Sequence, residues 1–166
     1  MIRTAKASDS QAIATVQVEG WQTAYNGLLC STFLAELSVP RRADIWHSEL
    51  KAGESVILVD AVDEIVRGFI DFGPDRNSKD AANVAEIRAL YVNPSEWGRG
   101  IGTSLCESAF AMMRARNFNE VVLWILKGND GPIKFYRKMG FTDDGLRKTD
   151  RIGNKDAEQL HLRMNL

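Results

Sequence analysis

The stretch VNPSEWGRGIGTSLCESAF, residues 92–110, places three glycines within five residues, directly in front of an amphipathic helix pattern. These glycines are Gly98, Gly100 and Gly102. Glycine lets another group approach bare backbone, and the first turn of a helix offers free N–H groups at the positive end of its dipole. The segment therefore indicates a site for a phosphate group. The alternative is a loose connection between a strand and a helix.

Two common phosphate-binding motifs do not fit this segment. A Walker loop requires a lysine after its second glycine, and no lysine lies nearby. The dinucleotide motif GxGxxG requires a glycine where Thr103 or Leu105 stands. What remains is WGRGIG, residues 97–102, in which Arg99 offers a side chain suited to phosphate oxygens. The free amides of the following helix turn would suit a pyrophosphate.

Apolar periodicity and turn-forming residues predict helices and strands on both sides of the glycines. Before them we expect a short first strand, a helix from the Ser8–Gln11 capping box to about Asn26–Gly27, a helical region over 31–50 that restarts at 38–40 and ends at Gly53, strands over 55–62, 65–73 and 84–92, and a surface loop over 74–83. After them we expect a helix over 100–116, a strand over 121–126 buried on both faces, a short helix over 131–139, and two strands around a Gly-Asn turn.

This order of elements predicts a mixed α/β fold, and residues 1–166 are expected to form a single domain. The 166 residues carry a formal net charge of −1 and a sequence pI near 6.1, so nucleic acid and an anionic membrane surface are poor expectations as partners. The two cysteines, Cys30 and Cys106, are expected to be reduced and buried, and two scattered histidines predict no zinc site. No signal peptide or membrane span is expected, so the protein is expected to be cytoplasmic.

Two segments together resemble one known family. ALYVNPSEWGRGIGTSL, residues 89–105, is similar to the acyl-CoA binding signature of the GNAT superfamily of N-acetyltransferases: Gln or Arg, two residues, Gly, one residue, then Gly or Ala. Gly100 and Gly102 occupy the two small positions, and Trp97 stands where Gln or Arg is usual. NDGPIKFYRKMGF, residues 129–141, resembles the second signature of the family, an Asn before a helix that carries a Tyr and closes in Gly-Phe.

The resemblance covers most of the chain and implies the GNAT fold, a single mixed and mostly antiparallel sheet of about seven strands with helices on both faces. It implies acetyl-CoA as the cofactor. The residues expected to bind it are Tyr91, Val92, Trp97, Gly98, Arg99, Gly100, Ile101, Gly102, Thr103, Asn129 and Lys138. Backbone N–H groups near Tyr91 and Val92, where the strand diverges from its neighbour, are the implied donors to the thioester carbonyl. Arg99 and Lys138 can instead be solvated side chains, and Asn129 can cap the helix that follows it.

Transfer of an acetyl group to an amine needs a base, because at neutral pH only about one primary amine in a thousand carries a free lone pair. Glu86 is the expected base, acting directly or through a water molecule, since it lies in an apolar strand where partial desolvation would raise its pKa. The alternative is a pair with Arg88, two residues along the same strand face. Tyr136 matches the general-acid tyrosine of the family and is expected to protonate the departing thiolate; its alternative role is core packing beside Phe135.

The acceptor site is expected near the first helices, where Trp21 and Tyr25 share a helical face. These two side chains and Phe72 are predicted to bind substrate, with a place in the hydrophobic core as the alternative. Trp46 is either a further lining residue or core. Glu19 and Asp71 are possible ligands for a cationic amine. The final strand and layout also look like bacterial polyamine acetyltransferases, but other small amines and peptide amines remain open.

The first functional hypothesis is an acetyl-CoA dependent N-acetyltransferase in which the amine attacks directly within a ternary complex. The second is a GNAT-like domain that binds acyl-CoA as a sensor without turnover. An unrelated nucleotide-binding protein is a third, if both resemblances are accidental. A homodimer is expected by analogy with the superfamily only.

Overall fold

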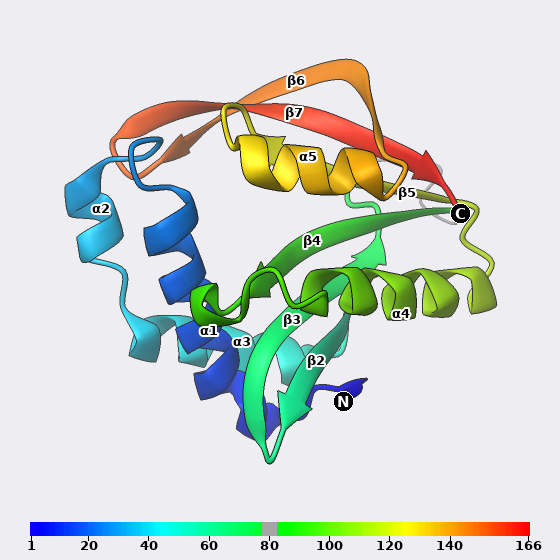
Figure 1. Cartoon of the computed structure of the whole chain (residues 1–166), viewed down its shortest axis with the longest axis horizontal. Helices are drawn as coiled ribbons and strands as arrows, with labels where there is room; N and C mark the ends of the chain where they lie inside the picture. The colour runs from blue at the N-terminus through cyan, green and yellow to red at the C-terminus, as the bar shows by residue number, and fades with distance from the viewer. Residues whose placement is uncertain (78–82) are drawn as a thin grey trace.

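The computed structural model describes residues 1–77 and 83–166, and shows one seven-stranded sheet between two layers of helices (Figure 1). The spatial order of the strands is β1-β2-β3-β4-β5-β7-β6, and every neighbouring pair is antiparallel except β4 and β5. This confirms the predicted mixed, mostly antiparallel sheet. The strands are β1 (Ile2–Thr4), β2 (Val56–Val62), β3 (Ile65–Pro74), β4 (Val84–Val92), β5 (Glu120–Leu126), β6 (Thr142–Ile152) and β7 (Lys155–Asn165).

Each face of the sheet has its own hydrophobic core. On one face, α1 (Ser10–Ala24) and α3 (Val39–Ala52) bury side chains such as Ile13 and Trp46 against Phe69 of β3. On the other face, α4 (Ile101–Ala115) and α5 (Asp130–Lys138) pack with apolar residues of β3, β5 and β7. The short α2 (Ser31–Ala35) closes a third, smaller cluster with α1 and the end of β5. Two 3-10 turns, η1 (Ala7–Asp9) and η2 (Pro94–Glu96), precede helices α1 and α4.

The helix boundaries show which local signals the chain uses. The predicted restart at 38–40 is confirmed, since the Ser38 hydroxyl accepts a hydrogen bond from the Arg41 N–H at the start of α3, and Gly53 ends this helix with a positive φ of 66°. The capping box at Ser8 is wrong, and α1 ends at Ala24, before the predicted Asn26–Gly27. The Asp9 carboxylate holds this corner instead, accepting hydrogen bonds from the Lys6 N–H and the Arg3 guanidinium.

The two hairpins form as predicted. Asp63 and Glu64 both have positive φ (49° and 65°), the conformation of a two-residue turn between twisted strands, and they join β2 to β3. The Gly153-Asn154 turn joins β6 to β7. Of the surface loop predicted over 74–83, Pro74 belongs to β3, and residues 78–82 lie outside the described residues.

The sheet opens between β4 and β5. These parallel strands pair only at Val84–Glu120, Ala85–Val121 and Glu86–Val122, although β4 continues to Val92 and β5 to Leu126. In the pairing of β3 with β4 the register shifts between Asp71 and Phe72, which leaves Arg88 of β4 as a bulge residue. Beyond Glu86 the two strands therefore leave a split in the sheet, bordered by the last six residues of β4, the end of β5 and the first turn of α4.

In the part of the chain that the structure describes, no helix combines the length and apolar character that crossing a bilayer requires.

Candidate active site

The glycine segment forms the turn into α4. Gly98 and Gly100 both have φ of +78°, a left-handed conformation that other residues rarely adopt, and Gly100 is the residue before the first turn of the helix. No side chain caps this end of α4 among the described residues. The first-turn amides of Ile101, Gly102 and Thr103 therefore lack intrahelical partners and are available to an anion at the positive end of the helix.

Trp97 closes this turn from the outside. Its indole Nε1 donates a hydrogen bond of 2.8 Å to the Val92 carbonyl, and the side chain remains 49% exposed. At the position where the family signature has Gln or Arg, this chain thus uses an aromatic ring that ties the end of β4 to the glycine turn.

The charged groups beside the turn are already partnered. The Arg99 guanidinium donates to Glu96 at 3.1 Å, and Arg67 lies 3.7 Å from the same carboxylate. Arg99 would have to leave Glu96, or share it, to contact a phosphate. Lys138 lies exposed at the last turn of α5.

The backbone of β4 points selected amides into the split. The Asn93 N–H, just after β4, donates to the Arg67 carbonyl of β3. Hydrogen-bonding directions alternate along an antiparallel strand, so the Tyr91 N–H also faces β3, whereas the N–H groups of Leu90 and Val92 face the split. Val92 thus fits the predicted carbonyl donor; the Tyr91 amide does not, and Leu90 was not predicted.

Tyr136 of α5 belongs to the core on the α4 face of the sheet, and lies close enough to Cys106 and Tyr25 for them to affect its pKa. It is buried, with its ring edge-on to Phe135 and Phe141 at centroid distances of 5.2 and 5.4 Å. Burial raises the pKa of Tyr136 well above its usual value, with smaller contributions from Cys106 and Tyr25. The phenol is therefore protonated at neutral pH, as a proton donor must be.

Asn129 precedes α5 and is also buried, but its side chain makes no capping hydrogen bond to this helix among the described residues. Capping, the alternative role considered for Asn129, is thus not what this side chain does. Its amide is available to another partner.

Three aromatic side chains meet on the α1 side of the split. The hydroxyls of Tyr25 and Tyr91 lie 3.2 Å apart in a hydrogen bond, and the ring of Trp21 packs edge-on to Tyr25 at 5.3 Å. The Trp21 indole N–H is buried and has no hydrogen bond among the described residues. The predicted pair Trp21 and Tyr25 thus gains a third member, the side chain of Tyr91, which the sequence indicated only for its backbone.

Phe72 and Trp46 belong to the core. Phe72 is 0% exposed and packs on the α4 face of the sheet, so the prediction that it lines the acceptor pocket with Trp21 and Tyr25 is wrong. Trp46 is buried against Phe69 on the other face, and its Nε1 donates a 2.8 Å hydrogen bond to Gln17.

Glu86 lies where β4 and β5 separate, but its partner was not predicted. Its carboxylate accepts hydrogen bonds from Arg76, which follows β3, and not from Arg88 among the described residues. Burial alone would raise the pKa of Glu86, but the hydrogen bonds and charge of Arg76 outweigh it and hold the pKa below its usual value. The expected raised pKa is therefore wrong for this conformation.

The two other acidic candidates differ from each other. Glu19 is exposed and accepts a 2.7 Å hydrogen bond from the Asn93 side chain. Asp71 is buried on β3; one of its oxygens has no hydrogen bond among the described residues, and burial raises its pKa. In the part of the chain that the structure describes, neither belongs to a group of three or more acidic, histidine or cysteine side chains that could bind a metal cation.

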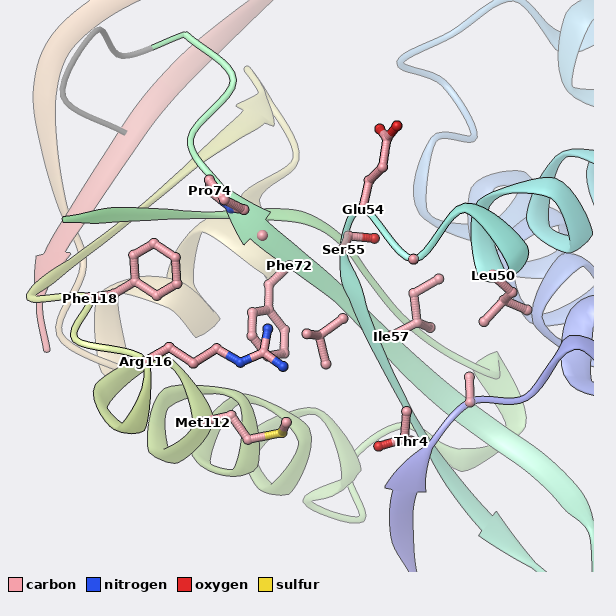
Figure 2. A pocket seen from close by; sticks show the side chains of 14 residues that line it. Thr4, Leu50, Glu54, Ser55, Ile57, Phe72, Pro74, Met112, Arg116 and Phe118 are labelled. Atoms are coloured by element: carbon pink, nitrogen blue, oxygen red, sulfur yellow. The ribbon is translucent and has the colours of Figure 1, made fainter. Parts of the chain in front are cut away.

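One pocket lies away from this site. A pocket of about 430 Å³ opens at the C-terminal end of α4, between Met112 of this helix, Arg116 just after it and the start of β2 (Figure 2). Phe72 forms part of its wall. The glycine turn is at the opposite end of α4, so this pocket is separate from the candidate active site.

Comparisons with known proteins agree with this geometry. The chain is 29% identical over 138 residues to the uncharacterized N-acetyltransferase YuaI of Bacillus subtilis, covering 82% of this chain and 76% of the relative. It is 25% identical over 162 residues to the spermidine N(1)-acetyltransferase of Thermoplasma acidophilum, covering 95% and 97%. Among solved structures, the PaiA N-acetyltransferase of Thermoplasma acidophilum in complex with coenzyme A superposes with a TM-score of 0.78 at 21% identity, covering 100% of this chain and 98% of that chain. The profile of the acetyltransferase (GNAT) family matches residues 21–141. Because this match spans most of the sequence, the chain belongs to the GNAT family of acetyltransferases.

Proposed function

We propose that this protein transfers an acetyl group from acetyl-CoA to a primary amine, and that the amine attacks the thioester directly. The observation that carries this proposal is the split between β4 and β5, which has free helix amides at one end and Tyr136 beside it. Acetyl-CoA would supply an activated acetyl thioester. The solved relative with coenzyme A supports the choice of cofactor.

The residues present fit such a cofactor. The first-turn amides of Ile101, Gly102 and Thr103 would bind its pyrophosphate, with Gly98 and Gly100 allowing the backbone turn. The side chain of Asn129, which is buried and makes no capping hydrogen bond to α5 among the described residues, would hold the pantetheine arm. The Val92 N–H, which faces the split, would donate to the carbonyl oxygen. Arg99 and Lys138 are proposed for outer phosphate contacts only.

Two side chains would move protons. Tyr136 is kept protonated by burial and would donate its proton to the departing thiolate. Glu86 is ionised and would accept the proton that the amine must lose. A covalent route through Cys106 is disfavoured, because burial raises the pKa of Cys106 to about 12 and so keeps that thiol protonated. Cys30 is also a free thiol, but only half-buried, which corrects the expectation that both are buried.

The acceptor is proposed to be a small primary amine that enters on the α1 side, beside Trp21, Tyr25 and Tyr91. The likeness to a spermidine acetyltransferase supports a small aliphatic amine.

A thiol-release assay with acetyl-CoA and a panel of amines tests the proposal. The panel contains spermidine, n-propylamine, an amino acid, an aminoglycoside and a lysine peptide. We expect amine-dependent release of coenzyme A together with the N-acetylated product by mass spectrometry. Binding of coenzyme A without release across the whole panel would instead favour the sensor hypothesis. Sedimentation analysis of the same preparation tests the expected homodimer.

A further inference from the structure

Arg76 covers the carboxylate of the proposed base. Its Nε donates to one oxygen of Glu86 at 2.9 Å and its Nη2 to the other at 2.7 Å, while the Arg76 backbone N–H adds a 3.2 Å hydrogen bond. Both oxygens that would have to receive a proton are therefore occupied by a guanidinium. The acid–base role of Glu86 requires this contact to open.

The two partners differ in their freedom to move. The Arg76 side chain is 60% exposed and the Glu86 side chain 3%. The backbone around Arg76 is held independently of this ion pair, because the Asp75 N–H donates to the Val84 carbonyl and the Asn77 N–H to the Asp75 carboxylate, both at 3.0 Å. The Arg76 side chain can therefore swing into solvent without unpairing β3 from β4.

The charges around Glu86 decide which group can replace the Arg76 guanidinium. Among the described residues, the charged groups that act on Glu86 are Arg76 and Arg88, and Asp71 and Asp75 act on Arg76. The β5 partner of Glu86, Val122, carries no charge. Departure of the guanidinium alone would leave a buried carboxylate without its main counter-charge, which is strongly unfavourable. A ligand that brings its own positive charge avoids this cost.

We propose that the ammonium group of the acceptor displaces the Arg76 side chain from Glu86, so that Arg76 is a positioning residue that covers the base between turnovers. This inference rests on the proposed acetyl transfer. It also restricts the acceptor class: the group that enters is a primary alkylammonium, small enough to take the place of a guanidinium. A neutral amide or alcohol cannot make this exchange.

The exchange also sets the direction of proton transfer. Once an ammonium replaces the guanidinium, a proton passes from its nitrogen to a Glu86 oxygen, which converts a buried ion pair into two neutral groups. Burial favours this product. The neutral amine then forms the C–N bond as the C–S bond breaks; the nitrogen's second proton replaces the one that Tyr136 gives the thiolate. When Arg76 returns, it favours the ionised carboxylate, and Glu86 releases its proton to solvent.

The test compares wild type with Arg76→Gln, Arg76→Lys and Glu86→Gln, using spermidine and n-propylamine as acceptors. In Arg76→Gln the pKa of the ascending limb of the kcat/KM profile should move to higher pH, because burial of Glu86 is no longer opposed by the guanidinium. The KM for the amine should fall by roughly three- to ten-fold, since the amine no longer competes with an ion pair. Arg76→Lys should keep the wild-type pKa of the ascending limb and the wild-type KM for the amine. Glu86→Gln should abolish the ascending limb, whether residue 76 is arginine or glutamine. Arg114→Gln, an exposed arginine near the C-terminal end of α4, is the control.

A second readout uses guanidinium ion as a probe. At non-denaturing concentrations it should inhibit Arg76→Ala competitively with the amine, by filling the vacated place, and should inhibit wild type much less. An unchanged limb and KM in Arg76→Gln, with thermal unfolding showing a folded protein, would overturn the proposal.

The inference and the proposed function fail separately. If wild type turns over no amine, the side-chain carboxyl of Glu86 can still be titrated by carbon NMR with and without methylammonium chloride. A pKa that is higher in Arg76→Gln than in wild type, and a Glu86 signal that shifts with methylammonium in the variant, would support the exchange. The absence of both would reject it.

Discussion

The proposed role of Tyr136 as a proton donor depends on the burial of its side chain. A phenol in water has a pKa near ~10, and burial raises the pKa of this one further, so it remains protonated until a thiolate forms beside it. Removing the hydroxyl while keeping the ring should therefore affect the chemical step and leave packing against Phe135 and Phe141 intact.

We predict that Tyr136→Phe lowers kcat by about 10²- to 10⁴-fold, with little change in the Kd for coenzyme A. Steady-state kinetics and calorimetric titration measure the two quantities. Tyr25→Phe removes a nearby hydroxyl that bonds to Tyr91, and is expected to change mainly the KM for the amine. A Tyr136→Phe enzyme with normal kcat would reassign this tyrosine to the core.

Phe72 illustrates a residue whose side the sequence did not reveal. Side chains alternate between the two faces along β3, but this alternation does not tell which face Phe72 occupies. The register shift opposite Arg88 and the placement of α4 decide that Phe72 faces the core. We predict that Phe72→Ala destabilises the protein by about 3–5 kcal/mol in urea unfolding, and that the folded fraction retains the wild-type KM for the amine. A raised KM for the amine without loss of stability would instead show that Phe72 contacts the acceptor.

At the scale of elements, α4 carries the clearest prediction, because its first turn depends on glycine backbone. Gly100 and Gly145 both have positive φ, +78° and +85°, and an added Cβ would meet nothing within 4 Å at either position. Alanine at either site should cost about 1–2 kcal/mol of stability through strain alone. We expect only Gly100→Ala to weaken coenzyme A binding. Relief of the backbone strain at residue 100 would reorient the first-turn amides of α4 away from the proposed pyrophosphate site, whereas Gly145 is not next to these amides. Equal affinities in the two variants, by calorimetry, would place the cofactor elsewhere.

The elements themselves were largely readable from local patterns, and their contacts were not. The glycine turn, the two hairpin turns and the Ser38 start of α3 each depend on residues within a few positions of one another, so the sequence predicts them. The Arg76–Glu86 pair spans ten residues and a change of strand, and the Tyr25–Tyr91 bond joins α1 to β4. Such pairs depend on strand register and helix placement, which the periodicity of one segment does not contain.

At the scale of the whole molecule, the free energy of unfolding should decrease at acidic pH, because the fold pairs carboxylates with arginine. The hydrogen bonds from Arg3 hold the pKa of Asp9 below its usual value against an opposing effect of burial. A lowered folded-state pKa contributes stability that is fully present above the unfolded pKa, and this contribution is lost as pH falls through the folded pKa. The stability that Asp9 gives to the corner between β1 and α1 is therefore lost in acid.

We predict that Asp9→Asn is less stable than wild type by about 1.5–3 kcal/mol at pH 7, and that this difference narrows as the pH is lowered below 4. Urea unfolding across this range measures it. A difference that stays constant with pH would show that packing of the side chain, and not its charge, stabilises the corner.

The short parallel contact between β4 and β5 has a consequence for how the molecule fluctuates. Among the described residues, three residue pairs join β4 to β5, whereas all seven residues of β2 pair with β3. Within the described residues, the N–H groups of Leu90 and Val92 face away from β3 and have no partner on β5. In the free protein, their amide protons should therefore exchange with deuterium far faster than those of β3. A ligand that bridges the gap would slow their exchange, and deuterium uptake would then report its occupancy without any assay of turnover.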